Sequence, residues 1–174
     1  RGAAAPAAGA GAGERVAVCV TGRLRALERT LATLEEQVLS VLEAEPGNAV
    51  DVFLYAPAPN AAGVARVAPL FGSQSAVRAA RFDDEGHVLE ALARIGKGGV
   101  LKQAMRIRGN WLGSAKRELL PGSRDRRAGT GLFQMYAHGE CLDMIRAREL
   151  RVGAKYDRVI TTRTDLRWLY PHPP

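Results

Sequence analysis

A strand–helix–strand pattern near the start of the chain constrains its fold more than any other feature. The run Val16–Val20 is short, continuous and apolar, which is typical of a strand buried on both faces. Apolar residues then recur at steps of three and four from Leu24 to Leu42, and this spacing predicts an amphipathic helix over 24–44. A second strand is expected at 50–55. The pattern predicts a βαβ unit, and therefore a parallel sheet.

The rest of the chain extends this pattern. A third strand is expected at 76–82, and short helices at 88–95 and 100–112. A long amphipathic helix is predicted over 132–150, followed by a last strand at 156–162, within which 158–162 joins the sheet. We therefore predict an α/β fold with a mainly parallel sheet and helices on both faces, a Rossmann-like architecture.

The 174 residues suffice for one domain with a core of its own. Residues 1–13 are almost only Ala, Gly and Pro, which predicts a flexible linker before a single α/β domain at 14–170. Because the chain starts at Arg1 and stops soon after a strand, we expect this domain to be truncated at its C-terminus. The two cysteines, Cys19 and Cys141, lie in apolar surroundings, which favours buried free thiols over a disulfide between them.

The net charge of +7 is concentrated in one part of the chain. Between Arg94 and Arg127 there are ten basic and two acidic residues, whereas the remainder is close to neutral. Such a segment predicts an anionic partner such as a phosphate, a nucleic acid or an acidic glycan. The alternative is a solvated loop, and the absence of apolar periodicity favours a mobile loop over 113–130.

Charged residues follow two of the predicted strands. The turn after the first strand contains Gly22, Arg23 and Arg25, and the last strand runs into Arg163 and Asp165. The carboxyl ends of parallel strands meet at one edge of a sheet, where α/β proteins bind ligands. Arginines beside a helix N-terminus suit a phosphate, and a carboxylate suits a divalent metal. A tight turn with solvated arginines and an Arg163–Asp165 ion pair are the structural alternatives.

Four short motifs occur in one order along the chain. They are the segments 15–25 and 51–57, then 131–134 with 141–142, and last 156–157 with Arg163-Thr-Asp165 and Trp168. Together they resemble an uncharacterised plant and algal family of glycosyltransferase-like domains, in which a late strand ends in Arg-x-Asp-x-x-Trp. The chain departs from that pattern at Thr161, where the family often has Arg, and at Arg167, where a full metal motif has a second acid.

The resemblance implies the N-terminal half of a GT-A-like fold and transfer of a sugar from a nucleotide sugar to a glycan or protein acceptor. It implies that Asp165 helps hold Mn²⁺ or Mg²⁺ on the donor diphosphate, and that Gly22, Arg23, Arg25 and Arg163 line the donor site. It favours the Golgi and the secretory pathway, with membrane attachment only through a segment outside this sequence. The alternatives are a non-catalytic module that binds nucleic acid or another polyanion through 94–127, which we disfavour, and a degenerate transferase domain kept as a scaffold.

Overall fold

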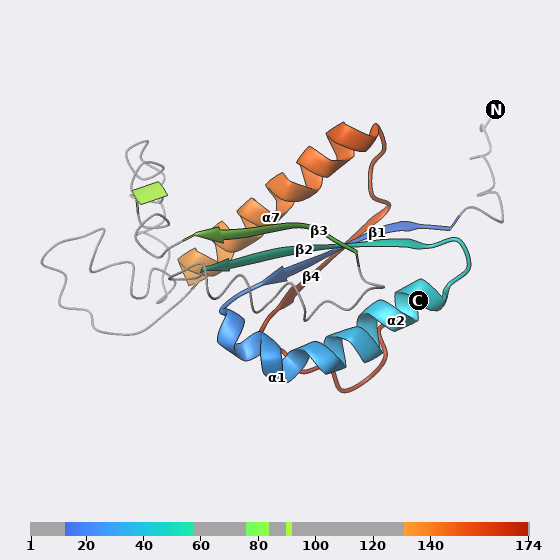
Figure 1. The fold of residues 1–174 in the computed structure, drawn as a ribbon, viewed down its shortest axis with the longest axis horizontal. Helices are drawn as coiled ribbons and strands as arrows, with labels where there is room; N and C mark the ends of the chain where they lie inside the picture. The colour runs from blue at the N-terminus through green and yellow to red at the C-terminus, as the bar shows by residue number, and fades with distance from the viewer. Residues whose placement is uncertain (1–12, 58–75, 84–89, 92–130, 174) are drawn as a thin grey trace, which may run out of the picture.

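The computed structural model describes residues 13–57, 76–83, 90–91 and 131–173 (Figure 1). The described strands are β1 (Arg15–Thr21), β2 (Ala49–Pro57), β3 (Ala76–Asp83) and β4 (Arg158–Arg163). The described helices are α1 (Leu24–Leu34), the π-helical turn η1 (Glu35–Leu39), α2 (Ser40–Ala44) and α7 (Gly131–Val152). These elements confirm the predicted strands and both long helices, with the last strand beginning at Arg158.

Several sequence-based expectations lie outside the described residues. They concern the linker at 1–13 (apart from residue 13), the short helices at 88–95 (apart from 90–91) and 100–112, the basic segment 94–127 and the mobile loop at 113–130.

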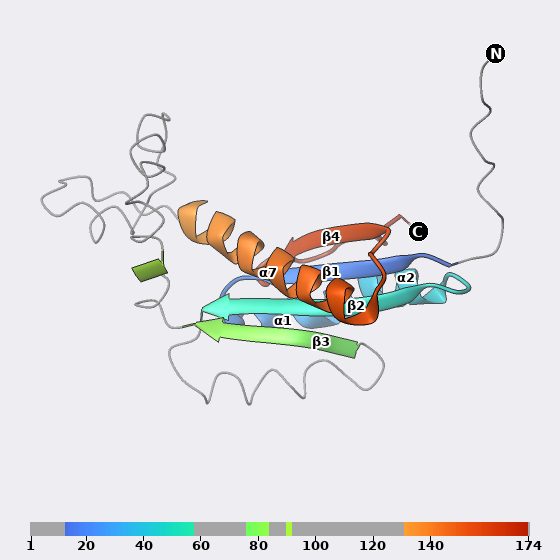
Figure 2. The ribbon, with the colours of Figure 1, turned by 90° about the horizontal axis from the view of Figure 1, so that it is seen from above.

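The four described strands form one all-parallel sheet in the order β3-β2-β1-β4. The fold class is therefore α/β, as predicted, and β1 is a central strand. The helical run from α1 to α2 lies on one face of the sheet and α7 lies on the other (Figure 1). Figure 2 shows that α7 crosses the sheet diagonally, with its first half toward the β4 side and its second half over β2.

This order creates a reversal between β1 and β4. From β1 the chain passes through α1 to reach β2 on one side of β1, whereas β4 pairs with β1 on its other side after α7 on the opposite face. The direction in which successive strands are added thus reverses at β1, and β4 lies beside β1 with the carboxyl ends of the two strands side by side. Such a topological switch point is where open α/β sheets form a crevice for a ligand.

The alternation of side chains along β1 explains how both faces are covered. Val16, Val18 and Val20 point toward α1 and join a buried cluster that also includes Leu27 and Val38. This cluster contains most of the periodic apolar residues of the predicted amphipathic helix. Because successive side chains of a strand point to opposite faces, the residues between these valines are left for the α7 side.

The core on the α7 side contains a disulfide. Ala17 and Cys19 of β1 pack with Phe53, Cys141 and Ile145, and Cys19 is bonded to Cys141 across a Cα–Cα distance of 6.1 Å. The expectation of two free thiols was therefore wrong. The apolar surroundings of each cysteine were read correctly, but their pairing depends on α7 lying antiparallel on β1, which brings two positions 122 residues apart into contact.

A buried carboxylate sits under the second half of α7. Asp51 of β2 accepts hydrogen bonds from the Tyr156 hydroxyl at 2.5 Å and from Arg78 Nε at 2.6 Å, and Arg148 Nε lies 3.6 Å away. Burial acts to raise the pKa of Asp51, but the hydrogen bonds from Tyr156 and Arg78, with the charges of Arg78 and Arg148, lower it below its ordinary value. This ionised group ties β3 and α7 to the centre of the sheet.

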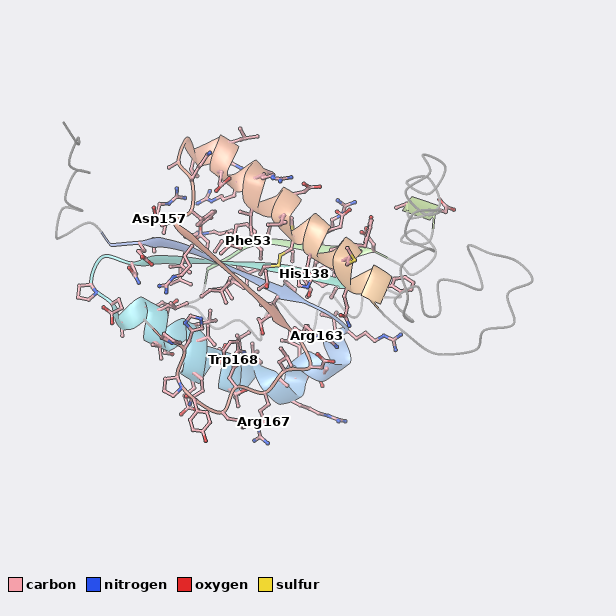
Figure 3. The ribbon with its side chains drawn as sticks, turned by 180° about the vertical axis from the view of Figure 1, so that it is seen from behind. Phe53, His138, Asp157, Arg163, Arg167 and Trp168 are labelled. Carbon is pink, nitrogen blue, oxygen red and sulfur yellow. A yellow bond between two sulfur atoms is a disulfide. The ribbon has the colours of Figure 1, made fainter. Side chains whose placement is uncertain are left out.

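The segment after β4 folds back along the helix on the other face. The Trp168 amide donates to Thr33 Oγ1 at 3.2 Å, and the His172 amide donates to the Gln37 carbonyl at 2.7 Å. The Trp168 side chain packs against the α1-side core, and Figure 3 shows it on this side of the sheet with Arg167. These contacts hold the chain beyond Arg163 against α1, and so determine where Asp165 lies.

Candidate functional site

The two sequence segments predicted to form the site are adjacent. Thr21 pairs with Arg163 in the register of β1 and β4, and the Thr164 amide donates to the Thr21 carbonyl at 2.9 Å. Gly22 and Asp165 follow these paired residues at the carboxyl edge of the sheet. The structure thus brings the Gly22–Arg23 turn and the Arg163–Asp165 pair together at the switch point between β1 and β4.

The local backbone conformation and the neighbouring Thr164 require a glycine at position 22. Its φ is +134°, a conformation that side chains rarely allow, and a Cβ atom there would lie 2.4 Å from Thr164 Oγ1. Its amide donates to the Tyr55 carbonyl at 3.1 Å, so this N–H is already used. Gly22 therefore makes room for Thr164 of the same chain. Contact between Gly22 and a ligand stays a prediction.

Arg163 and Asp165 form a bidentate pair. Arg163 Nε donates to Asp165 Oδ1 at 2.7 Å, and Nη2 donates to Oδ2 at 2.5 Å. The hydrogen bond from Arg163 lowers the pKa of Asp165, although partial burial acts in the opposite direction. Both side chains are substantially exposed, at 38% for Arg163 and 49% for Asp165. The pair therefore adds little to stability and leaves an ionised, accessible carboxylate at the sheet edge.

The N-terminus of α1 faces the same edge. Arg23 is its exposed N-cap residue, with no capping hydrogen bond from the side chain, and the first turn contains no acidic residue. Helix N-termini carry partial positive charge, and Arg23 adds a full charge beside it. Arg25 lies in the first turn of α1, but its side chain is outside the described part of the structure.

A hollow opens beside Asp165 on the α1 side. Its described lining is Ala26, Arg29, Thr30 and Asp165, and its volume is about 450 Å³. This volume lies within the range of small-molecule sites. Thr30 Oγ1 donates to the Thr164 carbonyl at 2.5 Å, so this wall is fixed to the β4 end.

Sequence reasoning missed Arg29 and Thr30 as lining residues. They lie one turn beyond the βα turn, and helical spacing places positions 26, 29 and 30 on one face of α1. The spacing alone shows that these three residues share a face of α1. It does not show that this face lines the site, because that depends on where the segment after β4 lies.

A polar cluster lies at the carboxyl ends of β2 and β3. The Tyr55 hydroxyl donates to Asp83 at 3.1 Å, and Arg81 pairs with both Asp83 at 3.3 Å and Glu140 at 2.5 Å. Burial and the nearby Asp83 carboxylate raise the Tyr55 pKa, and burial and Glu140 raise that of Tyr136 to about 12. These phenols remain protonated at neutral pH, and the cluster links the first half of α7 to β2 and β3.

The described side chains alone do not fit a divalent cation. No group of three or more His, Cys, Asp or Glu residues in the described ranges is placed to share one ion, and both Asp165 oxygens accept hydrogen bonds from Arg163. Hard cations take six or more oxygen ligands. Binding of Mn²⁺ or Mg²⁺ by Asp165 stays a prediction, in which a bound phosphate supplies oxygen ligands. None of the helices that the structure describes is long and apolar enough to span a membrane.

Comparison of this chain with protein-family models, with curated proteins and with solved structures finds no match. The glycosyltransferase-like resemblance therefore stays a prediction from the four motifs.

Proposed function

We propose that this chain is a glycosyltransferase-like domain that binds the diphosphate of a nucleotide sugar at the carboxyl ends of β1 and β4. The observation on which the proposal depends is the strand order β3-β2-β1-β4, whose reversal falls between the two segments that carry Gly22 and Asp165. The family resemblance falls on those same segments. The acceptor, a glycan or a protein, follows from the resemblance alone.

The charges at this edge suit a diphosphate. Arg23 and Arg29 on α1 and Arg163 on β4 provide three cations, against the single carboxylate of Asp165. When a glycosyl group leaves a nucleotide sugar, negative charge accumulates on the departing diphosphate. Fixed cations placed there stabilise that charge in the transition state.

Asp165 has two possible tasks in this proposal. As a structural partner, it orients the Arg163 guanidinium toward the crevice through the bidentate pair. As a metal ligand, it would supply a carboxylate oxygen to a divalent cation, whose charge would stabilise the departing diphosphate. These two tasks predict different metal dependence, and one experiment separates them.

Calorimetric titration of the 174-residue chain with UDP and with GDP, in Mn²⁺ and in EDTA, tests the proposal. We expect Arg29→Ala to weaken binding by about tenfold in both conditions, because it removes a charge-assisted contact. If Asp165 is a metal ligand, Asp165→Asn weakens binding in Mn²⁺ by about tenfold and has little effect in EDTA. If it only orients Arg163, its effect is the same in both.

Two surface variants serve as matched controls. Asp143 and Arg146 form an exposed pair on α7, with side chains 68% and 70% exposed. Asp143→Asn and Arg146→Ala make the same chemical changes away from the proposed site and should leave the affinity unchanged. Absence of nucleotide binding by the wild-type chain in every condition would contradict the proposed function.

If the chain is instead a non-catalytic module that binds a polyanion, calorimetric titration should give a different result. Binding of mixed-sequence nucleic acid through 94–127 would weaken steeply with salt and would not depend on metal. It would also be insensitive to Arg29→Ala.

A further inference from the structure

Three buried side-chain atoms of α7, His138 Nδ1, Glu140 Oε2 and Arg148 Nε, make no hydrogen bond in the part of the chain that the structure describes. Glu140 Oε2 lies in an ion pair with Arg81 and Arg148 Nε in one with Asp51. Nδ1 of His138 has neither kind of partner among the described residues. A buried nitrogen without a partner destabilises a fold by about 1 to 3 kcal/mol, so an unmatched one calls for an explanation.

The packing of α7 places His138 level with the carboxyl edge of the sheet. Ile145 packs with Ala17, and Cys141 is bonded to Cys19, so moving back along α7 corresponds to moving forward along β1. His138 lies a further turn back, which corresponds to the level of Thr21. Tyr136 confirms this level, because its ring packs 6.1 Å from that of Tyr55, the residue paired with Thr21.

Helical geometry places His138 on the flank of α7 that faces β4. Glu140 reaches Arg81 of β3, and two residues correspond to about 200° around a helix, so His138 points to the other side. Figure 2 shows the first half of α7 toward β4, and Figure 3 shows His138 on the side of α7 that faces the sheet.

The face of β4 beside His138 is open. Ile160 belongs to the α1-side core, so Val159, Thr161 and Arg163 point to the α7 side. Val159 is 43% exposed and Thr161 is also exposed, so α7 does not cover this part of the sheet. The uncovered surface ends at Arg163, whose Nε and Nη2 donate to Asp165, so His138 and Arg163 both lie toward the carboxyl edge on the α7 side of the sheet (Figure 3).

We propose that His138, whose side chain is only partly buried, is a ligand-binding residue of this site and that its imidazole turns, on ligand binding, to donate a hydrogen bond to a phosphate oxygen of the nucleoside diphosphate. This inference rests on the proposed function and adds a contact from α7 to those from α1 and β4. The diphosphate lies across the carboxyl ends of β1 and β4, with Arg29 on one side and His138 with Arg163 on the other. The bound phosphate then satisfies the imidazole donor.

Nitrogen-15 NMR of the histidine side chains tests this contact directly. The chain has three histidines, His87, His138 and His172, and the spectrum of His138→Asn assigns the His138 ring. We expect its ring signals to shift when UDP or inorganic pyrophosphate is added. The signals of His172 should stay in place, because its amide is bonded to Gln37, beyond the end of α1.

Affinity measurements complete the test. His138→Ala should weaken UDP binding by about tenfold, the usual size of one hydrogen bond to a charged group, whereas His172→Ala should not change it. His138→Asn keeps an amide nitrogen near the position of Nδ1 and should retain more affinity than His138→Ala. Thermal melting of each variant confirms that it is folded.

The outcomes separate this inference from the proposed function. If UDP binds but the His138 signals do not move, and His138→Ala binds normally, the His138 contact is wrong and the proposed function stands. If neither UDP nor pyrophosphate binds the wild-type chain, both are wrong.

Discussion

Substitution of Gly22 by Ala tests the central contact of the site. The backbone of Gly22 has a φ of +134°, and an added Cβ would lie 2.4 Å from Thr164 Oγ1. Holding a residue with a side chain in so sparsely populated a conformation costs about 1 to 3 kcal/mol, and overpacking a buried contact costs about as much again. We therefore expect Gly22→Ala to lower the free energy of unfolding by about 2 to 6 kcal/mol.

The overlap is hard to relieve by movement of the neighbour. Thr164 is 1% exposed, its amide donates to the Thr21 carbonyl at 2.9 Å, and its own carbonyl accepts from Thr30 at 2.5 Å. The hydroxyl responsible for the overlap has no hydrogen-bond partner within the described ranges. Removing that hydroxyl should therefore relieve the clash without breaking a bond to a described residue.

Urea denaturation of five variants measures the two contributions separately. Thr164→Ala removes Oγ1, so the Gly22→Ala/Thr164→Ala double variant should lose about 1 to 2 kcal/mol less than the sum of the single variants. Thr164→Ser keeps Oγ1, so the Gly22→Ala/Thr164→Ser double variant should show no such relief relative to its own single variants. The slope of the free energy against urea should stay constant if the denatured state is unchanged.

Two results would refute this reasoning. A Gly22→Ala protein within about 0.5 kcal/mol of wild type would show that the turn tolerates a side chain. Strict additivity of Gly22→Ala with Thr164→Ala would show that the overlap with Thr164 is not the cause of any loss.

Two further predictions concern the core on the α7 side. Asp51→Ala should lower the free energy of unfolding by about 1 to 3 kcal/mol, because it leaves the buried Tyr156 hydroxyl without its acceptor, whereas Arg78, 44% exposed, can turn to water. Since the folded state lowers the pKa of Asp51, its contribution is present above the ordinary carboxyl pKa and is lost as the pH falls through the folded value. Urea denaturation from pH 7 to pH 3 should show this loss in wild type and not in Asp51→Ala. Cys19 and Cys141, both fully buried, should resist alkylation in denaturant until a reductant is added, and the Cys19→Ala/Cys141→Ala variant should be less stable by about 2 to 5 kcal/mol, because the bond closes a long loop. Thiol labelling read by mass spectrometry, together with thermal melting, checks this prediction, and labelling without reductant would contradict it.

Local periodicity by itself determined the elements of this protein. The apolar run at Val16–Val20 predicted β1, because a strand buried on both faces is apolar throughout. The three- and four-residue steps after Leu24 predicted the helix that follows, because a helix buried on one face is apolar once per turn. The same logic placed Gly22 and Asp165 at the ends of parallel strands, and hence at one edge of the sheet.

Strand order and the pairing of faces were decided only by the tertiary structure. The position of β4 beside β1 creates the switch point, and no periodicity encodes which strand is a neighbour. The Cys19–Cys141 bond, the burial of Asp51 and the places of Arg29 and His138 depend on how α1 and α7 lie on the sheet. The spacing of apolar residues shows that one face of a helix or strand is buried. Which residues cover that face depends on contacts that are distant in sequence, such as the one between Cys19 and Cys141, which are 122 positions apart.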